Sequence, residues 1–180
     1  MPSSTGLNVI IVGAGIAGLG AARTLREKHH VIVLESSGMK NEIGAAIHMG
    51  ANASRILLKL GLSPQRVGSV YCNRVLERTY QNETQMDFII DTEKQWGSPW
   101  LLNHRADLHD ELRRLATDPE MPGQPAELRL GCTVQTCDAE AGTVTLTDGT
   151  VLKGDVIIGI LLNCFANSKV PTAFTQKFGR

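Results

Sequence analysis

The first forty residues contain two apolar runs separated by one amphipathic segment. Leu7–Val12 is short, rich in β-branched residues and followed by a glycine, which is typical of a parallel strand buried on both faces. Apolar residues then recur at helical spacing from Ile16 to Lys28, with charged residues on the other side. A second β-branched run, His30–Leu34, ends at Glu35. The pattern predicts strand, glycine turn, helix and strand, which together form one right-handed βαβ unit.

The next segment, from Ser36 to Ala51, is rich in glycine and shows little periodicity, so we expect a long loop of the kind that often carries function. The pattern beyond it predicts a helix capped by Asn52, a hairpin, a second helix and several short strands. The first helix is expected at Asn52–Leu60 with Ile56, Leu57 and Leu60 inward, and the hairpin pairs Val67–Leu76 with Met86–Ile90. The second helix is expected at Arg105–Ala116, with Leu108, Leu112 and Leu115 inward and Glu111 outward. The short strands are expected at Glu127–Leu130, Thr133–Thr136, Thr143–Leu146, Val151–Lys153 and Asp155–Gly159.

These elements predict an α/β fold: a Rossmann-like domain with a central parallel sheet and a small antiparallel layer. The parallel sheet is expected to contain Leu7–Val12, His30–Leu34, Glu127–Leu130 and Asp155–Gly159, with Leu7–Val12 away from its edges.

Charge and composition exclude several classes of function. Eighteen basic residues balance eighteen acidic ones, so no net field favours nucleic acid or an anionic membrane. The apolar runs are too short and too broken by glycine to span a bilayer, and the amino terminus does not resemble a signal peptide. We therefore expect a soluble cytoplasmic protein. The four cysteines and five histidines show no metal-ligand spacing, so no metal site is expected.

The candidate chemistry lies in a G-x-G-x-x-G turn formed by Gly13, Gly15 and Gly18. Gly13 permits a sharp turn after the strand, Gly15 lets the backbone approach a pyrophosphate, and Gly18 lets the helix pack closely on the sheet. The helix that follows presents free N–H groups and the positive end of its dipole to the phosphates. Glu35, at the end of the second strand, is placed to accept ribose hydroxyls and would repel a 2′-phosphate. The motif predicts a dinucleotide site without separating NAD from FAD.

Four collinear stretches resemble the FAD-dependent aromatic hydroxylases, the salicylate-hydroxylase-like flavoprotein monooxygenases. VIIVGAGIAGLGAARTL with VIVLE resembles their amino terminus, and EIGAAIHMGANASRILLKLGL resembles their flavin-side loop and helix. WLLNHRADLHDEL resembles their arginine helix, and LTDGTVLKGDVIIG the strand before their second fingerprint. The resemblance implies FAD as cofactor and NAD(P)H as co-substrate.

The same resemblance implies roles for individual residues. Gly13, Ala14, Gly15 and Gly18 would hold the pyrophosphate, and Glu35 would hold the adenosine ribose. Ala46 would lie against the cofactor through its backbone, and Arg105 would contact the phosphate and ribityl region. The catalytic residues remain unknown.

The chain departs from the family after DVIIG, where Ile160, Leu161 and Leu162 replace the family's alanine, aspartate and glycine. We therefore expect residues 1–159 to form an incomplete FAD-binding domain, and residues 160–180 to form a tail foreign to the family in a truncated product. The implied activity is NAD(P)H-dependent hydroxylation of an aromatic or polyketide-like small molecule by a complete enzyme. This shortened chain alone is not expected to complete turnover. Two alternatives remain: a nucleotide-binding remnant without turnover, and a fragment of an NAD-dependent dehydrogenase.

Overall fold

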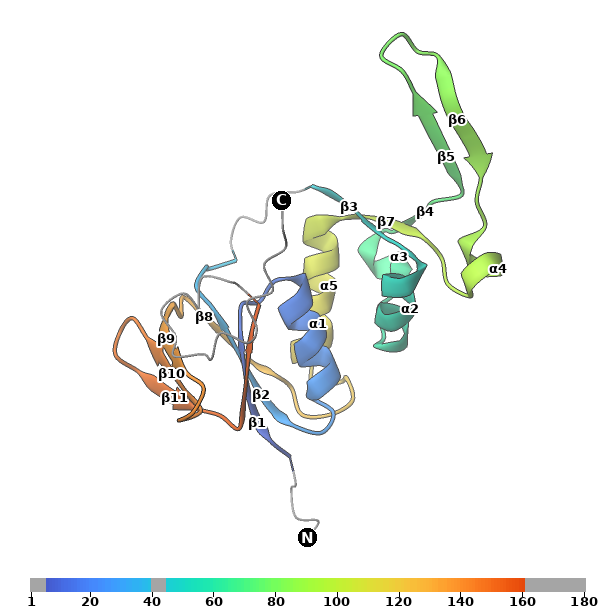
Figure 1. Cartoon of the computed structure of the whole chain (residues 1–180). Coiled ribbons are helices and arrows are strands. Elements are labelled where there is room, and N and C mark those ends of the chain that lie inside the picture. The colour runs from blue at the N-terminus through green and yellow to red at the C-terminus, as the bar shows by residue number, and fades with distance from the viewer. Residues whose placement is uncertain (1–5, 40–44, 161–180) are drawn as a thin grey trace. The chain divides into compact units, whose positions relative to one another are not determined.

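The computed structural model describes residues 6–39 and 45–160. The chain divides into two compact units (Figure 1). Unit 1 contains residues 1–40 and 116–180, and unit 2 contains residues 41–115. The tail expected over residues 160–180 lies outside the described residues, apart from Ile160.

Unit 1 is built on a four-stranded sheet in the order β12-β1-β2-β8. Its strands are β1 (Asn8–Val12), β2 (His30–Glu35), β8 (Glu127–Leu130) and β12 (Val156–Gly159). All three neighbouring pairs are parallel, and β1 lies inside the sheet between β12 and β2. The predicted parallel sheet and its four strands are therefore confirmed. The helix between β1 and β2, α1 (Ile16–Leu25), is shorter than the predicted Ile16–Lys28.

Two layers cover the sheet of unit 1, with α1 on one face and a three-stranded antiparallel sheet on the other (Figure 1). The antiparallel sheet has the order β11-β10-β9 and contains β9 (Val134–Asp138), β10 (Thr143–Leu146) and β11 (Val151–Lys153). Its Cys137, Val144 and Leu146 pack with Ile10 and Leu34 of the parallel sheet in one buried cluster. The predicted small antiparallel layer is thus confirmed.

Unit 2 contains helices, a three-stranded antiparallel sheet and a separate hairpin. The sheet has the order β3-β7-β4, and the hairpin pairs β5 with β6. The elements are β3 (Ala46–Met49), α2 (Ala51–Lys59), α3 (Pro64–Val67), β4 (Val70–Tyr71), β5 (Arg74–Arg78), β6 (Thr84–Ile89), α4 (Thr92–Trp96), β7 (Leu101–His104) and α5 (Arg105–Thr117), whose last two residues belong to unit 1.

Three predictions for unit 2 are wrong in detail. The hairpin begins at Arg74, because the first part of the predicted strand forms α3 and the short strand β4, which pairs with β7. Helix α2 has Gly50 at its N-cap in place of Asn52, and no side chain caps it. Its buried residues are the small Ala51 and Ser54, whereas Ile56 is 60% exposed. The Ser54 hydroxyl lies 2.9 Å from that of Ser98, so this face is held partly by polar contacts.

The second predicted helix is correct in position and in its apolar face. Leu108, Leu112 and Leu115 of α5 are fully buried. Glu111 was predicted to face outward and is instead 6% exposed. Its carboxylate is paired with Arg66 and Arg114, which offset the cost of burying the charge.

Within residues 6–39 and 45–160, no helix has the length and apolar character needed to cross a membrane. The same part of the chain contains no group of three or more potential metal-ligating side chains.

Candidate functional site

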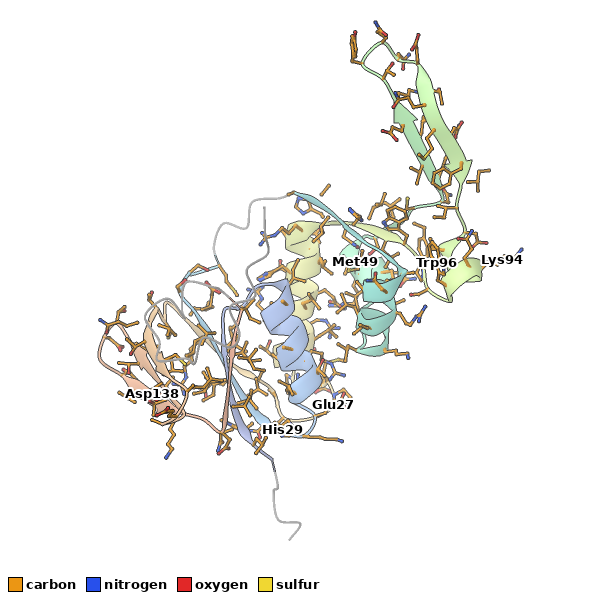
Figure 2. The ribbon with its side chains drawn as sticks, in the orientation of Figure 1. Glu27, His29, Met49, Lys94, Trp96 and Asp138 are labelled. Atoms are coloured by element: carbon orange, nitrogen blue, oxygen red, sulfur yellow. The ribbon has the colours of Figure 1, made fainter. Side chains whose placement is uncertain are left out.

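The glycine loop joins β1 to α1 at the carboxyl edge of the parallel sheet. The Gly13 amide donates to Leu34 O over 2.8 Å, so β1 stays paired with β2 up to the turn. Gly13 then has φ +106°, a conformation that side chains other than glycine rarely adopt. Glu27 and His29, labelled in Figure 2, lie just beyond the carboxyl end of α1. The amino terminus of α1 is therefore at the other end of the helix, next to the glycine loop.

Gly18 is required by close packing inside the loop. A Cβ on Gly18 would collide with the carbonyl oxygen of Gly13 and would lie 3.4 Å from the Ile160 side chain. The first turn of α1 therefore sits directly against the end of β1. This arrangement matches the packing role predicted for the third glycine.

Gly15 differs, because neither its backbone conformation nor the packing of the described residues requires a glycine. Its φ of −69° and ψ of −179° are accessible to any residue. Apart from its two chain neighbours, no described residue has an atom within 4 Å of a Cβ built on Gly15. Gly15 is also the N-cap of α1, whose first turn has no side-chain cap and no acidic residue. The loop thus presents open space beside unshielded helix amides, a combination that suits an anionic ligand.

Glu35 closes the loop from the neighbouring strand. Its Oε2 accepts the Ala14 amide over 2.8 Å, and its Oε1 accepts the Ser37 amide over the same distance. Burial raises the pKa of Glu35, but hydrogen bonds from Ser37, Ala14 and Ser36 outweigh this effect and hold the pKa below its ordinary value. The carboxylate is therefore charged at neutral pH.

The lowered pKa of Glu35 predicts a pH-dependent contribution to the stability of unit 1. Since the pKa is lower in the folded chain than in the unfolded one, the contribution is complete above the ordinary glutamate pKa of about 4.3. It is lost as the pH falls through the folded-state value. We expect Glu35→Gln to reduce the change in unfolding free energy between about pH 5 and pH 3. Urea denaturation of both chains across this range measures the difference, and identical pH profiles would contradict the prediction.

The two remaining predicted cofactor residues lie together in unit 2. Ala46, at the start of β3, pairs with His104, the last residue of β7. Arg105 follows at the start of α5, and its amide donates to Ala45 O over 2.8 Å. The structure therefore places Ala46 beside Arg105 although 58 residues separate them in the sequence. The first five predicted residues, Gly13, Ala14, Gly15, Gly18 and Glu35, are likewise brought together in unit 1.

One charged cluster in unit 2 was missed by the sequence reasoning. Glu111 accepts hydrogen bonds from Arg114 at 2.9 Å and from Arg66 at 3.2 Å. These residues line a shallow, solvent-open depression of about 410 Å³ together with Asp107 and Asp110. Of the two arginines, only Arg114 lies at helical spacing from Glu111, so the periodic pattern gave no sign that Arg66 joins them.

The arrangement in unit 1 can hold a dinucleotide. The open position at Gly15 and the amino terminus of α1 suit a pyrophosphate, and the charged Glu35 disfavours a 2′-phosphate nearby. These features are common to sites for NAD and for FAD.

Comparison with known proteins gives a family model named for NAD(P) and relatives that include a protein named for FAD. Residues 11–58 match the family model described as an NAD(P)-binding Rossmann-like domain. The chain is 39% identical over 155 residues to hispidin-3-hydroxylase of Neonothopanus nambi, and the alignment covers 85% of this chain and 37% of that protein. It is 42% identical over 163 residues to the FAD-dependent monooxygenase cfoG of Aspergillus candidus, covering 88% of this chain and 38% of that protein. The chain thus spans less than two-fifths of the length of these relatives.

Two solved structures align with a similar share of this chain. The HpxO protein of Klebsiella pneumoniae, solved with FAD, aligns with a TM-score of 0.69 at 26% identity, covering 84% of this chain and 38% of that one. A tetrameric form of 2-methyl-3-hydroxypyridine-5-carboxylic acid oxygenase aligns with a TM-score of 0.68 at 26% identity, covering 85% and 38%.

Proposed function

Because this chain is a relative of the FAD-dependent monooxygenases and matches their amino-terminal part, we propose that it binds FAD through the glycine loop of unit 1. The observation that carries the proposal is the open position at Gly15. Neither the backbone conformation nor the internal packing of the described residues requires a glycine there. A ligand whose phosphate oxygens approach the backbone does require one.

Each site residue has a role in this proposal. The loop from Gly13 to Gly18 and the first amides of α1 bind the pyrophosphate, and Glu35 accepts the hydroxyls of the adenosine ribose. Ala46 lies along the cofactor through its backbone, and the Arg105 guanidinium faces phosphate oxygens and the ribityl chain. These two assignments, and the grouping of residues 1–159 into one FAD-binding domain, rest on the family resemblance.

The bound FAD would supply the redox chemistry, accepting electrons from NAD(P)H and passing an oxygen atom from O₂ to the substrate. We propose a small aromatic substrate for the whole protein, since relatives are named for aromatic substrates such as 3-amino-4-hydroxybenzoate and 3-hydroxybenzoate. The cytoplasmic location expected from the sequence is part of the same proposal. A second candidate, NAD bound by the same loop, is favoured by the description of the matching family model.

Gly15→Ala tests the ligand role of the loop. The new methyl group occupies open space, but alanine is a poorer N-cap than glycine, so the unfolding free energy should fall by no more than about 1 kcal/mol. The same methyl group stands where the pyrophosphate must approach, so the dissociation constant for FAD should rise at least about tenfold. Fluorescence titration with FAD and urea denaturation measure the two quantities.

Gly20→Ala is the matched control, because Gly20 also has open space around it but lies within α1. Alanine favours the helix, so this variant should be more stable by about 0.5–1 kcal/mol and bind FAD unchanged. The ligand role of Gly15 would be contradicted if Gly15→Ala bound FAD as tightly as the Gly20→Ala chain.

A further inference from the structure

Glu35 forms a hydrogen bond to the glycine loop, with which it is expected to form the nucleotide site. Both carboxylate oxygens accept backbone amides, one from Ala14 in the glycine loop and one from Ser37 after β2. The two contacts join the end of β2 to the first residues of the glycine loop and to the segment after the strand. A carboxylate that only bound ribose hydroxyls would not need to reach the loop.

The Ala14 amide lies at the point where the chain leaves β1 and the loop begins. Gly13 continues the ladder to Leu34, and Ala14 is the first residue whose amide has left it. The next residue, Gly15, is the N-cap of α1. The Glu35 carboxylate therefore contacts the chain where it turns from strand to helix, one residue before Gly15.

We propose that Glu35 is a positioning residue for the glycine loop, because its carboxylate accepts the Ala14 amide and so holds the backbone one residue before the N-cap of α1. This deepens the proposed function, on which its consequence for ligand binding rests. It also changes the role of Ala14, whose amide donates to Glu35 and acts on the pyrophosphate indirectly, through the shape of the loop. A charged acceptor makes this hydrogen bond stronger than a neutral amide oxygen would.

The two roles of Glu35 are separated by a ligand without ribose hydroxyls. 2′,3′-Dideoxy-ADP keeps the pyrophosphate and adenine but offers no hydroxyl to Glu35. If Glu35 positions the loop, Glu35→Gln should weaken binding of dideoxy-ADP by about three- to tenfold, because glutamine offers one neutral acceptor to two amides. If Glu35 contacts only the hydroxyls, the two chains should bind dideoxy-ADP equally, and the proposal is overturned.

Asp155→Asn is the matched control, since Asp155 also accepts a backbone amide on β1. Its Oδ2 lies 2.7 Å from the Asn8 amide, at the end of β1 opposite the loop. The control should lose stability in the same way as Glu35→Gln but bind dideoxy-ADP like the unmodified chain. An equal loss of affinity in both variants would show a general effect of stability and would contradict a positioning role.

Hydrogen exchange of the Ala14 amide in the unmodified, ligand-free chain tests the contact even where Glu35→Gln does not fold or no nucleotide binds. We expect slow exchange for Ala14 and, where the variant folds, at least about tenfold faster exchange in Glu35→Gln. Fast exchange of Ala14 in the unmodified chain would refute the positioning contact. Slow exchange of the Ala14 amide in a chain that binds neither FAD nor dideoxy-ADP would refute the proposed function, but the contact between Ala14 and Glu35 would stand.

Discussion

Replacing Gly18 by alanine is expected to destabilise unit 1 by about 3 kcal/mol, one of the two largest effects that the structure predicts. The added methyl group collides with the carbonyl oxygen of Gly13, which is backbone and cannot move aside like the end of a side chain. Relief requires α1 to shift away from β1, and the helix would then lose part of its contact with the sheet. Urea denaturation followed by circular dichroism measures the loss.

The control for Gly18→Ala lies two residues further along the same helix. Apart from the nearby backbone of α1 itself, no described atom lies within 4 Å of a Cβ built on Gly20, so alanine there adds helix propensity without a collision. The two variants carry the same chemical change and should move stability in opposite directions. If Gly18→Ala were as stable as the unmodified chain, the close approach of α1 to β1 would be wrong.

Arg26→Met is expected to cost about 3–5 kcal/mol, because several carbonyl groups lose one donor together. Arg26 is 1% exposed. Its guanidinium donates to Ala116 O at 2.9 Å, Gln124 O at 3.0 Å, Gly123 O at 3.2 Å and Met121 O at 3.3 Å. One side chain on α1's carboxyl end thus holds the segment that leads into β8, and methionine can fill the volume without replacing any of these bonds.

Arg129→Met provides the comparison for Arg26→Met. Arg129 forms an ion pair with Glu127 at 2.8 Å, with both side chains at least one-third exposed. A surface pair of this kind contributes less than about 1 kcal/mol. Thermal or urea denaturation of both variants measures the difference, and similar losses would contradict the structural importance of the buried guanidinium.

The parallel sheet and the glycine loop could be predicted from the sequence because their signals are local. Two β-branched runs flank a helical repeat, and the glycine spacing places the turn between them. Glu35 could be named as a candidate site residue because it stands at the end of the second β-branched run. Its bond to Ala14 did not, because a hydrogen bond between a loop amide and a strand side chain leaves no periodic signal.

Buried charges were the main failure of the sequence analysis. Arg26 and Glu111 sit on amphipathic helices at positions that a polar pattern assigns to solvent. Arg26 is paired with carbonyls at least 90 residues away, and Glu111 with Arg66 at a separation of 45 residues. Such partners are set by the tertiary fold, so a pattern read along one helix cannot reveal them.

The strands of unit 2 were missed for a related reason. β3 lies in a glycine-rich segment with little periodicity, and its pairing with β7 joins residues more than fifty positions apart. The predicted hairpin was displaced because Val70 and Tyr71 pair with β7, a choice of partner that alternation alone does not decide.

The most direct test of the account is the visible absorption spectrum of the purified chain after incubation with FAD and removal of unbound nucleotide by gel filtration. We expect flavin absorbance to elute with the protein at about one FAD per chain, and with much less on the Gly15→Ala chain. A colourless chain that instead binds NAD in a parallel titration would contradict it.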